Sequence, residues 1–405
     1  MSMRPRTDSP STALRALVNE VTPCAIELRR HIHAHPELSG HEHGTAALVH
    51  RRLRELGLSP RYYVGKTGVV ATLDGGVGKT VVLRADMDAL PVVEETGASF
   101  ASTVPGAMHA CGHDVHTAML LGAAEALCRM RERVRGRVVF LFQPSEEVEP
   151  GGAIRMIDEG AFPRAACAVF GLHVSPDHPA GSVGIKPGSD CGSVLSFDVT
   201  IRGEGGHSAI PEKTVDPIVC AAAIVMALQT LVSRECPPVD PAVVSVGSMH
   251  AGTKGNVIPD QAVFSGTIRT LSVPLQRRLR TRLTQIVTSV AASMRARGSV
   301  AFHETYPPGF NNIALSQWAL SELGAHLGGK NVVERPHPSM FAEDFSRYQQ
   351  LVPGVYVHLG VRPPRAGTRA MHGIHTSRFL PHESAIGTGI LTHCVLALGV
   401  LGSPR

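Results

Sequence analysis

Short apolar runs, each followed by polar side chains, constrain the fold of this chain more than any other feature. Four such runs span residues 68–73, 80–84, 137–142 and 166–170. Helical stretches separate them, including one rich in Ala, Leu and Met over residues 114–131. Buried strands of a parallel sheet are uniformly apolar because helices cover both of their faces. These runs therefore predict an α/β domain with a mostly parallel sheet and helices on both faces.

Helices are predicted before the first of these strands. Apolar residues recur at helical spacing from Leu14 to Val21. Thr22 and Pro23 then predict a new helix start, because Thr is a favourable N-cap and Pro suits the first helical position. A further helix is expected over residues 42–56, where Gly57 closes it.

The α/β pattern of apolar runs separated by helices stops near residue 193 and returns near residue 306. Between these points the expected elements alternate as strand, helix, two strands and helix, an order typical of a small α+β domain. They cover residues 196–202, 216–233, 242–249, 262–270 and 275–297. We therefore predict a catalytic domain made of residues 1–192 and 306–405. A smaller lid or dimerisation domain, residues 193–305, is inserted into it.

Composition excludes several classes of function. The formal charge of +5 over 405 residues, with no basic run along one face, predicts no nucleic-acid partner. No apolar run reaches the roughly 18 residues of a membrane span, and no signal core follows the polar start. We therefore expect a cytoplasmic protein without a membrane partner. The eight cysteines lack paired spacing, which favours free thiols, and the 21 histidines point to metal chemistry.

A cysteine and a histidine two residues apart form the first candidate metal site. Cys111 and His113 supply a thiolate and an imidazole, and Gly112 lets the backbone bend so that both face one point. Such a pair suits zinc or a similar borderline metal. Taken alone, the motif is equally compatible with a buried cysteine beside a surface histidine.

Polar side chains also follow the apolar runs, where each predicted strand ends. Asp86 follows the second run, Glu146 and Glu147 follow the third, and His173 follows the fourth. The carboxyl ends of parallel strands meet at one edge of a sheet, where open α/β sheets bind ligands. Two adjacent buried carboxylates require a cation, so one is expected to bind metal and its neighbour to act as a base. Solvated acids and a structural histidine remain the alternatives for each motif alone.

Two other segments contribute candidates. Near the end of the chain, either His372 or His375 could complete a metal site. In the expected inserted domain, His207 and Asn256 lie beside glycines in loops, where they could donate hydrogen bonds to a substrate oxygen. Ordinary turn chemistry is the alternative for both, and the residues alone favour it.

Together these motifs resemble the two-metal aminoacylase/carboxypeptidase superfamily. Within it, they are most similar to the branch of hippurate hydrolases, N-acyl-amino-acid amidohydrolases and auxin-conjugate hydrolases. The resemblance extends from about Arg29 to the last predicted helix. It is carried by residues 29–37, 83–91, 108–114, 143–147, 205–208, 256–259, 266–270 and 343–345.

The resemblance implies two divalent metal ions per subunit, held by five side chains with the thiolate sulfur bridging the ions. By position, these ligands are Cys111, His113, Glu147, His173 and His375. Zinc is the first expectation for the metal, and manganese, cobalt and nickel are the alternatives. The family's last ligand usually precedes a Ser/Thr/Asn-Pro pair, whereas Thr376 and Ser377 follow here, so His372 stays open as the last ligand.

The resemblance also implies roles for the other candidates. Glu146 becomes the general acid/base, and Asp86 orients the site. The inserted domain mediates a homodimer in this family, so His207 is expected to reach into the active site of the partner subunit. Asn256 and Arg269 match substrate-contacting positions.

The predicted function is hydrolysis of the amide bond of an N-acyl amino acid or a similar small N-acyl amide, by a metal-activated water that Glu146 deprotonates. One alternative is a dipeptidase of the same superfamily. The Cys-x-His ligand pair, in place of a His-x-Asp pair, favours the acyl-amino-acid branch. A second alternative is a non-catalytic binding protein on this scaffold. The intact Glu146 argues against it, because a protein that only binds has no need of a base.

Overall fold

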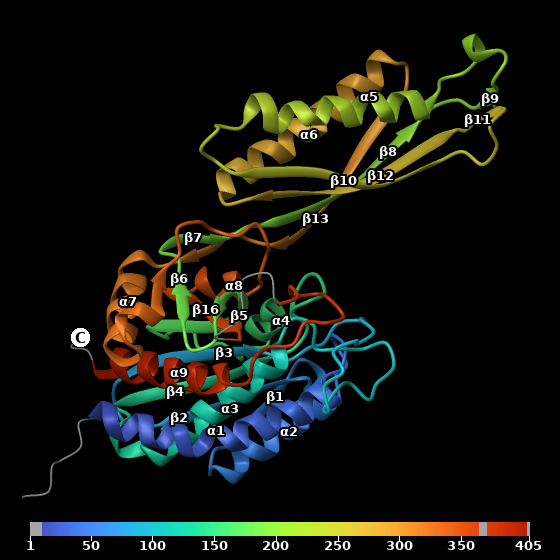
Figure 1. Ribbon diagram of the computed structural model, residues 1–405. Helices are drawn as coiled ribbons and strands as arrows, with labels where there is room; N and C mark the ends of the chain where they lie inside the picture. The colour runs from blue at the N-terminus through green and yellow to red at the C-terminus, as the bar shows by residue number, and fades with distance from the viewer. Residues whose placement is uncertain (1–9, 364–370, 403–405) are drawn as a thin grey trace, which may run out of the picture. The chain divides into compact units, whose positions relative to one another are not determined.

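The computed structural model describes residues 10–363 and 371–402, so the first nine residues of the polar start lie outside it. The chain forms two compact units (Figure 1). The first consists of Met1–Gly188, Phe310–His337 and Arg347–Arg405, and the second of Ser189–Gly309 and Pro338–Ser346. The expected inserted domain, residues 193–305, lies within the second unit. The second unit also includes residues 338–346, which the sequence had assigned to the catalytic domain.

An eight-stranded sheet forms the centre of the first unit. Its strands are β1 (Arg61–Tyr63), β2 (Gly68–Asp74), β3 (Lys79–Asp86), β4 (Gly136–Gln143), β5 (Ala168–Pro179), β6 (Val183–Ile185), β15 (Val332–Glu334) and β16 (Gly354–Arg362). They are ordered β1-β2-β4-β3-β5-β16-β6-β15. The four central strands, β4, β3, β5 and β16, are parallel, whereas β2 and β6 run antiparallel to their inner neighbours. The predicted α/β class with a mostly parallel sheet is confirmed.

Helices bury both faces of this sheet, as β3 illustrates. Val81 and Leu83 pack into the main core together with residues of three long helices, while Val82, which points the other way, is equally buried. Because neither face meets water, the strands are uniformly apolar in sequence. The α-helices that lie wholly or mostly in the first unit are α1 (Pro10–Ala34), α2 (His43–Glu55), α3 (His113–Arg129), α4 (Gly152–Asp158), α7 (Ile313–Leu327), α8 (Ser346–Gln349) and α9 (Ala385–Gly402).

The predicted helix start at Thr22 and Pro23 is wrong. A single helix, α1, runs through Pro23, although proline removes one backbone hydrogen bond from a helix interior. The apolar stripe from Leu14 to Ala25 packs into the main core. This burial along one continuous face keeps the two halves of α1 together.

The second unit is built on a four-stranded antiparallel sheet, ordered β10-β12-β8-β13. Its strands are β8 (Val194–Arg202), β10 (Ala242–Ala251), β12 (Gln261–Thr270) and β13 (Arg297–Tyr306). Helices α5 (Pro217–Thr230) and α6 (Val273–Ser293) share one apolar core with the sheet. A separate ribbon pairs β9 (Gly206–His207) with β11 (Val257–Ile258). Two short strands, β7 (Gly188–Cys191) and β14 (Gly309–Asn311), lie where the chain passes between the units.

Two helices correct the expectation that no apolar stretch is long enough to span a membrane. Pro217–Glu235 and Ala385–Gly402 reach mean hydropathies of 1.6 and 1.8. By length and composition alone, both could cross a bilayer. However, 72% of the second is buried inside the protein, which is what a core helix of a folded domain requires. The first is 33% buried and includes α5.

Candidate metal centre and active site

The predicted metal ligands in the first unit come from segments far apart in sequence. The chain leaves β4 at Gln143 and reaches Glu146 and Glu147 within four residues, while β5 carries His173. Helix α3 begins at His113. The prediction that His173 follows the end of its strand is wrong, because β5 continues to Pro179. Since β3 and β5 are parallel and their last pair is Arg84 with Gly171, His173 still lies level with the carboxyl end of β3.

Gly112 allows Cys111 and His113 to serve the same site. Its φ of +83° lies in the left-handed region that favours glycine. A Cβ atom at this position would also lie 2.6 Å from a methyl carbon of Val174 on β5, so no larger residue fits without a shift. The turn therefore depends on glycine for both its conformation and its close packing against β5.

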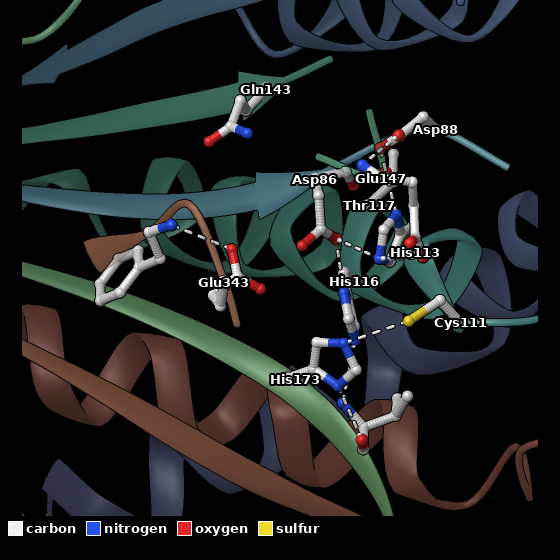
Figure 2. A network of polar contacts seen from close by, with 12 residues as sticks. Asp86, Asp88, Cys111, His113, His116, Thr117, Gln143, Glu147, His173 and Glu343 are labelled. Carbon is white, nitrogen blue, oxygen red and sulfur yellow. Dashed lines mark hydrogen bonds and ion pairs between the residues drawn. The ribbon is translucent and has the colours of Figure 1, made fainter. Parts of the chain in front are cut away.

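The structure brings all five predicted ligands together around the Cys111 sulfur. Sγ lies 3.4 Å from Nε2 of His173 (Figure 2) and 3.3 Å from Nε2 of His375. Oε1 of Glu147 lies 3.3 Å from Nε2 of His375 and 3.9 Å from Nε2 of His113.

These side chains form two groups of three that could each hold an ion. One comprises Cys111, His113 and His173, the other Cys111, Glu147 and His375, and within each group the ligand atoms lie within 4.8 Å of one another. The groups share the cysteine sulfur, as a bridging thiolate requires. Within the described part of the chain, the second group contains His375 and not His372.

Two buried ligand atoms fit a metal ion directly. Nε2 of His113 and Oε1 of Glu147 are shielded from solvent, and neither makes a hydrogen bond with any described residue. Leaving such atoms unpaired is unfavourable, and divalent cations bound at the two ligand groups would satisfy both. A thiolate with three imidazoles and a carboxylate is a donor set for zinc or a neighbouring transition metal.

Hydrogen bonds orient the ligand imidazoles. Nδ1 of His173 donates to the carbonyl oxygen of Val174 at 2.8 Å, and Nδ1 of His113 donates to Asp88 at 3.2 Å. Each bond places a proton on Nδ1, so that in the neutral ring the lone pair of Nε2 is left to bind a metal. The other carboxylate oxygen of Asp88 accepts the backbone N–H of Glu147 at 2.9 Å. One buried carboxylate thus orients two of the ligand residues.

Asp86 lies behind the ligands and contacts two buried basic groups. Its Oδ1 is 2.5 Å from Nδ1 of His116, and its Oδ2 is 2.5 Å from Nη1 of Arg84. His116 in turn accepts the backbone N–H of Val174, next to His173, at 2.9 Å (Figure 2). Asp86 therefore acts on the ligands through His116, which the sequence analysis missed. The available signal was its spacing, one helical turn after His113.

The electrostatics of the site favour a bound cation. Burial raises the pKa of the Cys111 thiol well above its usual value, and the carboxylate of Glu147 raises it further. Burial alone would lower the pKa of His113, but nearby carboxylates, chiefly Asp86, outweigh it and raise that pKa to about 10. A divalent ion would neutralise this excess of negative charge and favour the thiolate form of the cysteine.

Glu146 lies beside the ligands without belonging to either group that contains Cys111. It is 6% exposed, and its carboxylate lies within 4.8 Å of ligand atoms of His113 and Glu147. A carboxylate at this position can exchange a proton with a molecule held at the centre.

The second unit contains the remaining predicted residues and separates them into two places. His207 on β9 is exposed and pairs with Val257 on β11, next to Asn256. Nδ1 of His207 accepts the backbone N–H of Ala209 at 3.1 Å, which leaves its proton on Nε2. Arg269 lies at the far end of β12, about 27 Å along the strand from its start near this ribbon, and donates to the carbonyl oxygen of Met340.

Comparisons with known proteins show the family to which the chain is similar. The chain matches the model of the peptidase family M20/M25/M40 over residues 82–397. Thermostable carboxypeptidase 1 of Saccharolobus solfataricus is 39% identical over 385 residues, which cover 94% of this chain and 96% of the relative. The N-acetyl-L-cysteine deacetylase of Bacillus subtilis is 39% identical over 362 residues, covering 89% and 84%. The crystal structure of the Bacillus subtilis YXEP protein, a dinuclear metal binding peptidase of the M20 family, has a TM-score of 0.83 and 34% identity, and covers 95% of this chain and 100% of that one.

Proposed function

Since this chain belongs to the peptidase family M20/M25/M40 and is a hydrolase, we propose that it cleaves the amide bond of N-acyl amino acids at a two-metal centre. The observation that carries the proposal is the placement of Glu146. It is a buried carboxylate beside two ligand groups that share the sulfur of Cys111.

The relatives support two substrate classes, and we propose the acyl amino acid as the first. A deacetylase of N-acetyl-L-cysteine removes a small acyl group from an amino acid, while a carboxypeptidase cleaves between amino acids. Both reactions break an amide bond, so the same centre serves either. The Cys-x-His ligand pair favours the acyl-amino-acid branch, and a dipeptidase is the second candidate.

In the proposed reaction, Glu146 moves the proton. Two divalent ions, for which we propose zinc, lower the pKa of water and polarise a carbonyl when bound. Glu146 accepts a proton from the attacking water as the oxygen bonds to the amide carbon. It then donates this proton to the leaving nitrogen as the carbon–nitrogen bond breaks. A carboxylic acid and a free amine are released, so atoms and charge balance without a covalent acyl-enzyme.

We further propose a homodimer formed through the second unit, with His207 acting in the active site of the partner subunit. Helix α5 exposes apolar side chains, including Val219 at 58% and Met226 at 71%. Strand β10 forms an edge of its sheet and pairs only with β12 among the described strands. An exposed apolar helix beside an open strand edge is a surface suited to association with a second copy. The Nε2–H of His207 would donate to the developing oxyanion.

Glu146→Gln tests the proposed function. N-acetyl and N-benzoyl amino acids are assayed beside dipeptides, using metal-reconstituted protein. The variant should keep its metal content and lose turnover by at least about a thousandfold. Glu149→Gln, which changes an exposed carboxylate of the same loop, should retain wild-type turnover. Full activity of Glu146→Gln would refute the assignment of the base, and activity on dipeptides alone would make the second candidate correct.

A further inference from the structure

The carboxylate of Glu42 reaches the turn that carries Glu146, although 103 residues separate Glu42 from Ser145. Its Oε1 accepts the backbone N–H of Ser145 at 2.7 Å and the hydroxyl of the same serine at 3.3 Å. It also accepts the backbone N–H of Gly40 at 3.0 Å. Glu42 is completely buried, so these bonds form where water does not compete.

Ser145 adopts a conformation that needs external support. Its φ is +56°, in the left-handed region that is unfavourable for a residue with a side chain. Such a conformation costs about 1–3 kcal/mol and persists only where surrounding contacts hold it. Ser145 directly precedes Glu146, so its backbone angles set the direction in which the next side chains leave the strand.

A second buried carboxylate holds the other side of the same turn. Asp88, 1% exposed, accepts the backbone N–H of Glu147 at 2.9 Å. The peptide N–H groups of both residues that flank Glu146 are therefore bound by carboxylates from distant parts of the chain. The carbonyl oxygen of Ser145 is bound as well, by the N–H of Gly152. This turn is fixed from several directions.

Helix capping does not explain Glu42. It occupies the N-cap position of α2, but its side chain makes no capping hydrogen bond to that helix. Glu37 supplies the cap instead, because its carboxylate accepts the backbone N–H groups of Gly44 and Thr45 at 2.8 and 2.7 Å. Burial raises the pKa of Glu42 to about 7, so its placement is unfavourable for the charged form. The carboxylate of Glu42 is therefore buried unfavourably without capping its own helix, and its bonds to Ser145 are the contacts that explain its position.

We propose that Glu42 is a positioning residue for the reaction, whose carboxylate holds Ser145 in its left-handed conformation and thereby directs Glu146 and Glu147 into the active site. The part that concerns catalysis rests on the proposed function of Glu146. The part that concerns the turn does not, because it follows from hydrogen bonds within the first unit.

Three variants test the inference. Glu42→Leu removes the acceptor, Glu42→Gln keeps a carbonyl oxygen that can accept the N–H of Ser145, and Glu37→Gln weakens the helix cap as the matched control. Hydrogen exchange of the peptide over residues 143–152 is measured on metal-free and zinc-loaded protein, beside kcat and KM. Glu42→Leu should speed exchange in this peptide about tenfold and lower kcat about a hundredfold, with KM within about threefold. Glu42→Gln should recover most of the lost kcat, and Glu37→Gln should lower stability alone.

Ser145→Gly supplies the decisive combination, since glycine adopts a positive φ without support. Added to Glu42→Leu, it should recover at least about tenfold in kcat, a non-additive effect that a general loss of stability would not produce. Unchanged exchange and kcat in Glu42→Leu would overturn the proposal, as would an equal loss of kcat in Glu37→Gln. If Glu42→Leu does not fold, unchanged exchange of residues 143–152 in Glu42→Ala overturns it. A wild-type protein inactive on N-acyl amino acids would refute the proposed function, while the exchange measurements would still decide the role of Glu42.

Discussion

Nε2 of His375 lies 3.3 Å from Sγ of Cys111, although 264 residues separate the two in sequence. The backbone of His375 explains this proximity. Its N–H donates to the carbonyl oxygen of Ala110 at 2.8 Å, and its φ is +64°. The end of the chain is thereby fixed next to the turn that precedes α3, which completes the second ligand group.

The first prediction concerns the shared sulfur. Cys111→Ala should reduce bound metal from two ions per chain to one or none, because both ligand groups lose the same donor. Metal content after gel filtration, measured by atomic emission, checks this. Cys128→Ala alters a free, half-buried cysteine and should keep both ions. Two ions retained by Cys111→Ala would remove this residue from the ligand set.

The second prediction concerns metal removal. The centre contains buried ligand atoms without hydrogen-bond partners, so bound ions should stabilise the folded state. Zinc at about one hundred times its dissociation constant should add about 2.7 kcal/mol per site, with a matching rise in Tm. Chelator-treated protein titrated with zinc in thermal unfolding checks this. A Tm independent of zinc would contradict it.

The third prediction concerns Asp86. Its replacement by alanine removes the carboxylate that the buried guanidinium of Arg84 and the ring of His116 share. Removing one member of a buried ion pair costs about 3–5 kcal/mol, and denaturant unfolding of the metal-free protein should show a loss of that size. Asp198→Ala breaks an exposed pair with His303 and should change stability by less than about 1 kcal/mol. Similar losses in both variants would contradict the role given to Asp86.

The fourth prediction concerns pH. Burial raises the pKa of Glu42 from 4.5 to about 7, so between these values the folded protein holds a proton that the unfolded chain has lost. Stability should therefore decrease as pH rises through this window and then level off. Glu42→Gln should remove this contribution, about 3 kcal/mol between roughly pH 4.5 and pH 7. Denaturant unfolding of metal-free wild type and variant at several pH values checks the sign. A wild type that gains stability over this window relative to Glu42→Gln would contradict it.

The fifth prediction concerns the proposed dimer. Glu146→Gln and His207→Ala should each be inactive alone. Mixed and allowed to exchange subunits, they should regain about a quarter of wild-type activity, because half of the sites in mixed dimers combine an intact Glu146 with a partner's intact His207. Activity assays after mixing, with the molar mass measured by light scattering, check this. Two inactive variants that stay inactive in verified mixed dimers would place His207 in its own subunit's site.

Much of the fold follows from sequence, because the apolar runs and helical spacing report burial directly. Strands β2, β3 and β4 and helix α3 lie within a few residues of their expected positions, whereas β5 continues to Pro179, well beyond the end expected at residue 170. The helix start predicted at Thr22 and Pro23 was wrong because local helix-start signals carry no information about the core against which α1 packs. Likewise, α9 has the length and mean hydropathy of a membrane span, and only its burial inside the protein indicates a core helix.

The five proposed ligand side chains could be named from sequence because each lies in a short motif of residue types that bind metals. The residues that hold them could not. His116, Asp88 and Glu42 make contacts across 25 to 103 residues of sequence. His116 has one local signal, its spacing of one helical turn from His113, whereas nothing local distinguishes Asp88 and Glu42 from other buried polar residues. The position of Arg269, distant along β12 from the His207 ribbon, likewise depends on strand pairing.

The two ligand groups differ in their contact with water. The side chain of His375 is 51% exposed and that of Glu147 is 10% exposed, whereas His113 is fully enclosed. An ion held by the outer group should consequently dissociate first, and the inner one only after it. Stepwise loading would then yield a protein with two different metals in a defined order, in which the role of each ion can be studied separately.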